Sequence, residues 1–109
     1  MLTKEQKLNK LYELGFSPAY SGFSAILELV EVWKPNDKIC VAYAIAGKRL
    51  GISGARVERN IRFSIEKAMS YNHSGMCAFM RNAFDPRRGY PTNHEFIGVL
   101  WHYFNASTT

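Results

Sequence analysis

Apolar residues recur at spacings of three and four along most of this 109-residue chain, and glycine or proline interrupts each run. Leu8, Leu11 and Tyr12 begin the pattern, and Gly15 ends the first run. Three-and-four spacing places side chains on one face of an α-helix, whereas a half-buried strand needs alternation of period two. No convincing alternation extends over the length of a strand, so the sequence predicts an all-α fold.

The positions of the helices follow from capping residues and breakers. Thr3 and Thr92 are expected N-caps, and Thr92 with Glu95 three residues later has the spacing of a capping box. Two prolines and one glycine within residues 85–91 predict a loop. The expected helices cover about residues 4–14, 21–33, 39–50, 53–71, 75–83 and 93–104.

Length and composition indicate one domain over residues 1–109. Apolar residues make up 47% of the chain and aromatic residues 14%, which is enough to fill a single core without a metal or a disulfide. The longest uninterrupted apolar run, residues 39–46, is too short to cross a bilayer. The first ten residues lack the apolar core of a signal peptide. We therefore expect a cytoplasmic protein, located at the bacterial nucleoid if it binds DNA, with no membrane partner.

The residues that most often carry catalysis or bind metals form no recognisable set. Cys40 and Cys77 lie in apolar stretches, which favours buried, reduced thiols. His73, His94 and His102 form no convincing ligand set. The chain also lacks the patterns of a phosphate-binding loop, a nucleophile elbow and a catalytic site with two paired carboxylates. The prediction is a protein that is not an enzyme and needs no cofactor or metal.

The net charge of +5 is unevenly distributed. Residues 1–42 contain five lysines and five acidic residues, whereas residues 43–90 contain nine Lys or Arg and three acidic residues. Clustered cations favour binding to a polyanion, because condensed counterions are released from its phosphates. A solvated charged face explains the same distribution, so charge alone leaves both interpretations open.

The stretch of about 43–70 fits a helix-turn-helix motif. Such a motif needs small residues where its two helices cross, a turn residue that tolerates positive φ, and apolar residues that fix the crossing angle. Ala46 and Gly47 are the small pair, and Gly51 is the turn. The residues expected to wedge the helices together are Leu50, Ile52, Val57 and Ile61.

The second helix of this motif, about 53–70, is the expected recognition helix. Helical geometry places Arg56, Arg59 and Arg62 on its exposed face together with Phe63, and Glu58 lies on the flank of that face. The arginine fork matches the O6 and N7 atoms of guanine, and a carboxylate accepts from cytosine N4, so this mixture suits reading of DNA bases. The alternative is that Glu58 and its neighbours only pair with Arg62 on a solvated helix.

Further residues are candidates for contact with the DNA backbone. Ser53 is placed to cap the recognition helix, and the amides of the first turn would then face a phosphate. Phe63 is a candidate for contact with a thymine methyl group, for packing under the loop, or for contact with a protein partner. The remaining candidates are cations at the end of the first motif helix and in the 85–91 loop, namely Lys48, Arg49, Arg87 and Arg88.

Three segments together resemble a known family. They are Gly51–Met69, Tyr90–Leu100 and Leu14–Phe23, which carry the patterns Arg-Val-Glu-Arg, Ile-Arg, Ile-Glu and Pro-Thr-Asn-x-Glu-Phe-Ile. They are similar to the C-terminal effector domain of the stage-zero sporulation protein A family, which are sporulation response regulators. The resemblance covers nearly the whole chain. Asn60 and Phe63 depart from the alanine and histidine of the family, and we expect this chain to lack the phospho-receiver domain of the regulator.

The resemblance implies a single six-helix domain of the winged-helix-like DNA-binding superfamily. It also implies binding to promoter boxes of double-stranded DNA, as tandem copies, and contact with the sigma subunit of RNA polymerase. By position, Arg56, Glu58, Arg59 and Arg62 fall on the recognition helix of the family. The expected function is sequence-specific transcription regulation. The alternative is a protein-interaction module that keeps this fold and uses Phe63, Tyr71 and the 76–84 helix to bind a regulator or a polymerase subunit.

Overall fold

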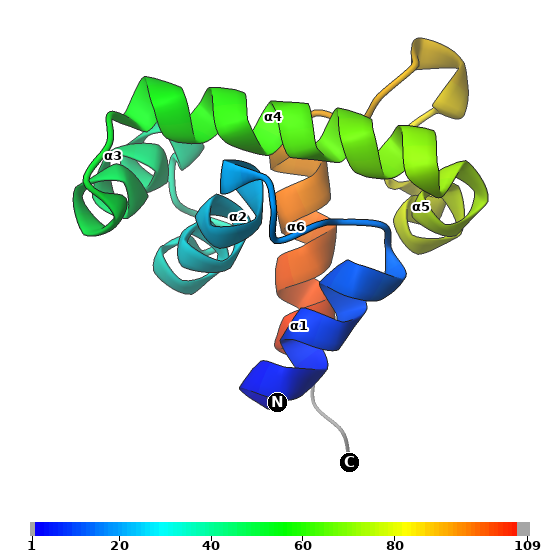
Figure 1. Cartoon of the computed structure of the whole chain (residues 1–109), viewed down its shortest axis with the longest axis horizontal. Coiled ribbons are helices and arrows are strands. Elements are labelled where there is room, and N and C mark those ends of the chain that lie inside the picture. The colour runs from blue at the N-terminus through cyan, green and yellow to red at the C-terminus, as the bar shows by residue number, and fades with distance from the viewer. Residues whose placement is uncertain (1, 107–109) are drawn as a thin grey trace.

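The computed structural model describes residues 2–106, apart from the side chain of Asn82. Over this range the chain forms six α-helices and two single turns of 3₁₀-helix, with no strand (Figure 1). This arrangement confirms the predicted all-α, six-helix fold. The expected domain of 1–109 extends to residues 1 and 107–109, which lie outside the described range. The elements are α1 Lys4–Glu13, α2 Ser21–Val32, α3 Ile39–Leu50, α4 Gly54–Tyr71, α5 His73–Met80, η1 Arg81–Ala83, η2 Pro86–Arg88 and α6 Asn93–Phe104.

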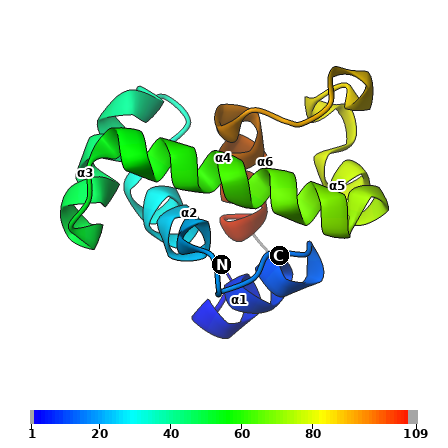
Figure 2. The same ribbon diagram turned by 45° about the horizontal axis from the view of Figure 1, so that its top comes forward.

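Helix α4 is the longest element and lies across one side of the molecule. Figures 1 and 2 show it extending from α3 at one end to α5 at the other, over α2 and α6. The closest packing in the fold joins α4 to α3 and α2, and these two helices also pack on each other. One face of α4 is therefore held by the core and the opposite face is open to solvent.

The core forms where α4 meets α2 and α6. The inward face of α4 is buried throughout, because Val57, Ile61, Ser64, Ile65 and Ala68 are each at most 4% exposed. Complete burial of an aliphatic side chain contributes about 1.5–3 kcal/mol, so this face largely fixes the rotation of α4 about its axis. On the opposing helices the fully buried residues are Ala25, Ile26, Leu29, Phe96, Ile97 and Leu100.

Helices α2 and α4 pack closely against each other at Gly22. A Cβ atom at this position would lie 2.1 Å from Ser64 Oγ and 2.3 Å from the carbonyl oxygen of Asn60. Only a glycine allows this separation of the two helices. The buried Oγ of Ser64 makes no hydrogen bond within the described part of the chain.

Both predicted threonine caps are present. Thr3 and Gln6 form a capping box at α1, and Thr92 and Glu95 form one at α6. At α6 the Thr92 N–H donates to Glu95 Oε1 at 2.9 Å, and the Glu95 N–H donates to Thr92 Oγ1 at 3.1 Å. Partial burial of Glu95 would raise its pKa, but the hydrogen bonds from Thr92 and Arg88 outweigh this effect and hold the pKa below its ordinary value.

Replacing Glu95 by glutamine should make the stability of the protein depend less on pH. Glutamine can still complete the capping box, so the loss is the charge that Arg88 and the positive end of α6 favour, about 0.5 kcal/mol at pH 7. A carboxyl group whose pKa is lowered by folding stabilises the native state above its unfolded pKa, and this contribution is lost as the pH falls through the folded pKa. Urea denaturation of both proteins should therefore differ at pH 7 and converge below pH 4.5, the ordinary pKa of glutamate. An undiminished difference in acid would contradict this explanation.

The region after α4 differs from the prediction. Helix α5 begins at His73 rather than Gly75, because the Asn72 side chain accepts a hydrogen bond from the Gly75 N–H and caps an earlier start. It ends at Met80 and a 3₁₀ turn follows. The expected loop of 85–91 contains a further 3₁₀ turn with proline at its start, where Asp85 accepts from the Arg87 N–H.

The prediction of buried thiols is wrong. Cys40 is exposed and Cys77 is half-buried, and both are unbridged. Cys77 Sγ lies 3.7 Å from His73 Nδ1, a contact that the sequence analysis missed although the two residues are four apart on one helix. Within residues 2–106 no third His, Cys, Asp or Glu joins them to form a group that could hold a metal ion.

Across the described residues, no helix combines the length and the apolar character that crossing a membrane would require.

Candidate nucleic-acid interface

The chain reverses between α3 and α4 in a tight turn centred on Gly51. This residue has φ +74°, a left-handed conformation that favours glycine, and its N–H donates to the carbonyl oxygen of Gly47. The N–H of Ile52 donates to the same oxygen at 2.9 Å. Ser53 then caps α4 by accepting the Arg56 N–H at 3.1 Å. The predicted turn residue and the predicted cap thus have the expected local geometry.

Small residues bring the two helices of this motif into contact. Ala46 and Gly47, the predicted small pair, are both buried. A Cβ atom on Gly47 would lie 2.5 Å from the carbonyl oxygen of Ile52, and one on Gly54 would lie 3.1 Å from the backbone nitrogen of Ala44. Of the expected wedge, Val57 and Ile61 are fully buried, whereas Leu50 and Ile52 are half-buried. The core anchors α4 through buried residues that extend from Val57 to Met69.

The first two turns of α4 present two arginines to solvent. Arg56 and Arg59 are exposed, and neither forms an ion pair with a carboxylate of the described chain. They lie three residues apart, so their side chains lie on neighbouring turns of one face. A guanidinium group that has no carboxylate partner in the protein does not have to lose one when it binds a phosphate or a base.

Arg62, the third predicted arginine, is engaged by a neighbour. Its Nη1 lies 2.8 Å from Glu58 Oε1, one turn earlier on the same helix, and both side chains are about half exposed at 55% and 45%. This pair matches the alternative in which Glu58 balances Arg62 on a solvated helix. It also holds both functional groups in one defined arrangement beside Arg59.

The two cations at the end of α3 differ in their surroundings. Lys48 is exposed and forms no ion pair within residues 2–106. Arg49 Nη1 instead lies 3.2 Å from Glu28 and 3.9 Å from Glu31, two carboxylates on α2. Arg49 therefore links α3 to α2, and its binding to phosphate would require it to leave these partners.

The two arginines of the 85–91 loop are also paired. Arg87 contacts both carboxylate oxygens of Asp85 and holds the pKa of this group below its ordinary value through these hydrogen bonds. Arg88 Nη2 lies 2.8 Å from Glu95 of α6. The Arg87 side chain is nevertheless 90% exposed, so a partner can still reach it.

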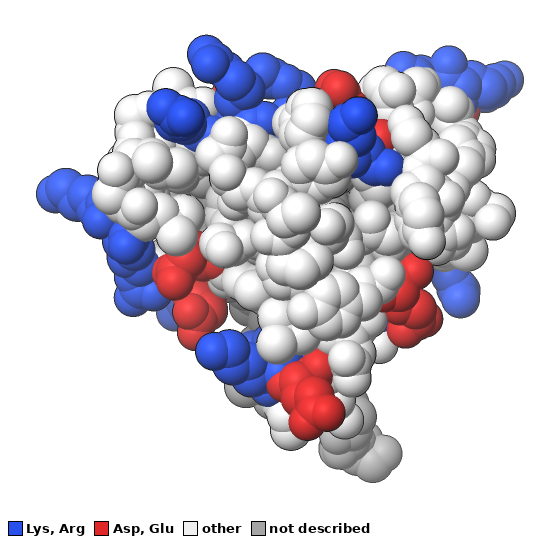
Figure 3. All heavy atoms as spheres, in the orientation of Figure 1, with Lys and Arg blue, Asp and Glu red and all other residues white. Residues whose placement is uncertain are grey.

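The cations form a rim rather than a continuous patch. Figure 3 shows Lys and Arg side chains along the edge of the molecule over α4, over α3 and at the tip of the loop that follows α5. On the broad face turned to the viewer, charged side chains lie over α4, beside α2 and around α1, and only the middle of this face is almost free of charge. The basic edge includes the solvent face of α4.

Phe63 is exposed as predicted, but it packs on a neighbour that the sequence did not indicate. Its ring lies edge-on to Tyr20, the residue before α2, with ring centroids 5.3 Å apart, and Lys67 Nζ lies 5.4 Å from the Phe63 ring centroid. The prediction that the 76–84 helix belongs to an alternative protein-binding surface is partly wrong, because Met76, Met80 and Phe84 are buried in the core. Tyr71 is 82% exposed.

One hydrogen bond between elements far apart in the sequence holds α4 in place. The buried Asn93 side chain donates to the carbonyl oxygen of Glu58 at 2.9 Å, which joins the start of α6 to the middle of α4. Burial raises the pKa of Tyr43 on α3, although a hydrogen bond from Asn93 opposes the shift. No local sequence signal links residues 35 positions apart, so Asn93 was not predicted.

Comparison with known proteins gives one match. Residues 8–104 match the family described as Sporulation initiation factor Spo0A C terminal, a span that contains α2 to α6 and most of α1. No curated protein and no solved structure matches the chain. The match agrees with the resemblance found in the sequence and with the all-helical fold. The chain therefore belongs to the Spo0A C-terminal domain family, a family of DNA-binding effector domains of a sporulation transcription factor and not of enzymes.

Proposed function

We propose that this protein is a sequence-specific transcription regulator whose helix α4 enters the major groove of double-stranded DNA. The observation that carries the proposal is the pair Arg56 and Arg59, exposed and without carboxylate partners within the described chain. They follow directly after the turn at Gly51. A helix of this kind reads bases with residues near its N-terminus, while the preceding helix crosses the DNA backbone.

The arginines of α4 take different parts in this interface. Arg56 and Arg59 would each donate two hydrogen bonds to a guanine. Arg62 and Glu58 enter as a preformed pair 2.8 Å apart, so Glu58 accepts from cytosine only if Arg62 releases one of its oxygens. Phe63 packs against Tyr20, which leaves its exposed side, 45% of the residue, for contact with a thymine methyl group.

Contacts with the DNA backbone would come from both sides of α4. Lys48 has no carboxylate partner within the described residues and is the first candidate, together with the N-terminal amides of α4 next to Ser53. Arg49, Arg87 and Arg88 would exchange acidic partners for phosphates. Each would contribute less binding free energy than an unpaired cation, because the loss of its ion pair offsets part of the new contact.

The wider setting follows the family. We propose that the chain acts in the cytoplasm at the nucleoid, on promoter boxes, as tandem copies on DNA and with a contact to the sigma subunit of RNA polymerase. The membership of the family and the basic edge support the DNA partner most directly.

The test is a selection of random DNA duplexes with the purified protein, followed by titration of an enriched duplex at several salt concentrations. A regulator should enrich one motif and bind it about 10³-fold or more tightly than random DNA. Its affinity for both duplexes should fall linearly with the logarithm of the salt concentration. If no motif is enriched and only weak binding remains at physiological salt, the protein-interaction alternative replaces this proposal.

A further inference from the structure

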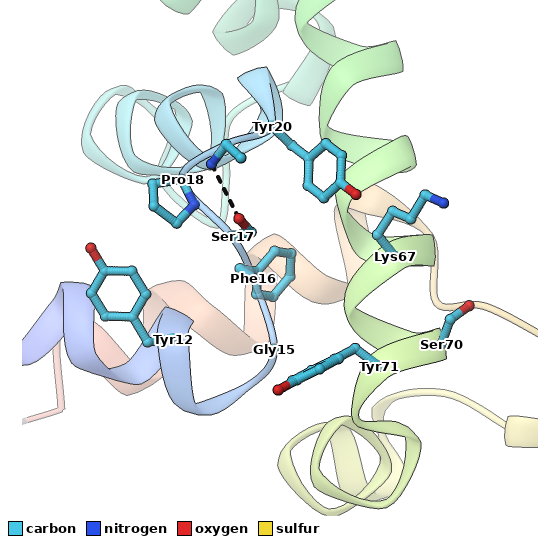
Figure 4. A pocket seen from close by; sticks show the side chains of 10 residues that line it. Tyr12, Gly15, Phe16, Ser17, Pro18, Tyr20, Lys67, Ser70 and Tyr71 are labelled. Atoms are coloured by element: carbon cyan, nitrogen blue, oxygen red, sulfur yellow. Dashed lines mark hydrogen bonds between the residues drawn. The ribbon is translucent and has the colours of Figure 1, made fainter.

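An open groove of about 670 Å³ lies beside the second half of α4, on the face that Figure 3 turns to the viewer (Figures 3 and 4). Its floor contains Phe16, and its sides are formed by Tyr12 at the end of α1, Tyr20 before α2, and Tyr71 at the end of α4. Phe16 is 4% exposed, whereas the three tyrosines are 48%, 39% and 82% exposed. The groove is therefore a fixed aromatic floor surrounded by accessible rings.

The polar groups of this groove are available to a ligand. Figure 4 draws a hydrogen bond from the Ala19 N–H to Ser17 Oγ at 3.2 Å, and backbone hydrogen bonds also join Gly15 to Tyr12 and Tyr20 to Ser17. The tyrosine hydroxyls and the Lys67 ammonium group are thus not used by other residues of the groove. Lys67 is the only charged residue of the lining, and no acidic residue accompanies it. Within residues 2–106, Lys67 contacts the face of Phe63 and no carboxylate.

We infer that this groove binds an extended, acidic segment of a partner protein that carries proline or an aromatic residue. Tyrosine faces offer a large contact area at a low entropic cost, and aromatic grooves suit the preformed extended helix of proline-containing peptides. A carboxylate of the segment would pair with Lys67. Because the groove is open, a small molecule would leave much of its surface in water, whereas a chain can lie along it.

The charge of the lining favours a peptide over nucleic acid. A single strand carries one phosphate per nucleotide, and proteins that bind it combine stacked aromatic residues with a positively charged track for the backbone. Here one lysine serves a groove with three tyrosines. The inference does not rest on the proposed DNA reading, since Arg56 and Arg59 do not line the groove.

The experiment is a selection from a displayed library of random twelve-residue peptides, with the Tyr71→Ala variant used to remove peptides that bind elsewhere. Tyr71 is largely exposed, so its truncation should leave the fold intact. Enriched peptides should combine acidic residues with proline or an aromatic residue. When the best of them is synthesised, Tyr71→Ala should weaken its binding by about 10-fold or more. Lys67→Gln should remove the preference for that peptide over its glutamine-for-glutamate version.

Two matched variants and two further probes keep this result specific. Tyr90→Ala removes an exposed tyrosine that does not line the groove, and Lys34→Gln removes a lysine that does not line it, and neither should change the affinity. Failure to enrich any peptide, or enrichment of basic ones, overturns the inference.

Binding of a twelve-nucleotide thymidine strand that depends on Tyr71 would assign the groove to nucleic acid. Self-association in sedimentation that is lost in Tyr71→Ala would assign it to a second copy of this chain. Loss of DNA reading in the Arg59→Ala variant with peptide binding retained would separate the two proposals.

Discussion

Replacing Gly22 by alanine should lower the free energy of unfolding by more than about 2 kcal/mol. The new Cβ would lie 2.1 Å from Ser64 Oγ and 2.3 Å from the carbonyl oxygen of Asn60. The serine oxygen can rotate to another position, but a backbone oxygen within α4 moves only with its helix. Relief therefore requires α2 and α4 to separate, which opens the packing around fully buried residues. Urea denaturation followed by circular dichroism at 222 nm measures the change.

Gly98→Ala is the matched control for this substitution. Gly98 is also inside a helix, α6, but no heavy atom lies within 4 Å of a Cβ placed there. Alanine stabilises an uncrowded helical position by about 0.5–1 kcal/mol relative to glycine, so this variant should be more stable than the parent protein. Equal stability of Gly22→Ala and the parent protein would mean that the two helices do not approach as closely as described.

Most of the fold could be predicted because its information is local. Repeated apolar residues and caps such as Thr3 and Thr92 act over one or two turns of helix, and the predicted bounds of α2, α3 and α6 agree with the structure within about a residue. The bounds of α5 were less accurate, because the Asn72 cap depends on a side chain in an irregular conformation between two helices. Short helices carry too few periodic positions to correct such an error.

The close approach at Gly22 and the incomplete burial of both cysteines could not be predicted for a different reason. Each depends on which helices meet and at what distance, and a single sequence does not contain that distance. Cys40 lies in an apolar run, Ile39–Ala46, yet it falls on the outer face of α3 while Ala42 and Ala46 face the core. The apolar residues around Cys40 indicated burial, but the rotation of α3 about its axis turns this residue to solvent.

The candidate site shows the same division. Helical geometry correctly placed Arg56, Arg59 and Arg62 on the solvent face of α4, and the Glu58 pairing followed from the spacing of four residues. The partner of Arg49 lies 21 residues away on α2, so its ion pair could not be predicted from local spacing. The structure thus separates cations that have a carboxylate partner from cations that have none within the described chain, a difference that the sequence did not show.

That difference leads to the second large prediction, which concerns Arg59. Its replacement by alanine should weaken binding to the selected DNA motif by about 1–3 kcal/mol, or about 5- to 150-fold, if its guanidinium reads a guanine. Binding to random DNA should change much less, because the lost contact is with a base. The side chain is exposed and forms no ion pair within the described chain, so stability should change by less than about 0.5 kcal/mol. Fluorescence anisotropy with both duplexes at one salt concentration gives the comparison.

Arg87→Ala provides the contrasting case. Arg87 lies in a loop, 90% exposed, where a cation meets phosphates without a fixed orientation to base edges. Its loss should weaken binding to both duplexes equally and make the slope of affinity against salt less steep by about one. If Arg59→Ala behaves in this same way, Arg59 is a phosphate contact and the sequence is read elsewhere on α4. Arg56, one turn nearer the start of the helix, would then be the residue to replace, since it is the other arginine of α4 without a carboxylate partner in the described chain.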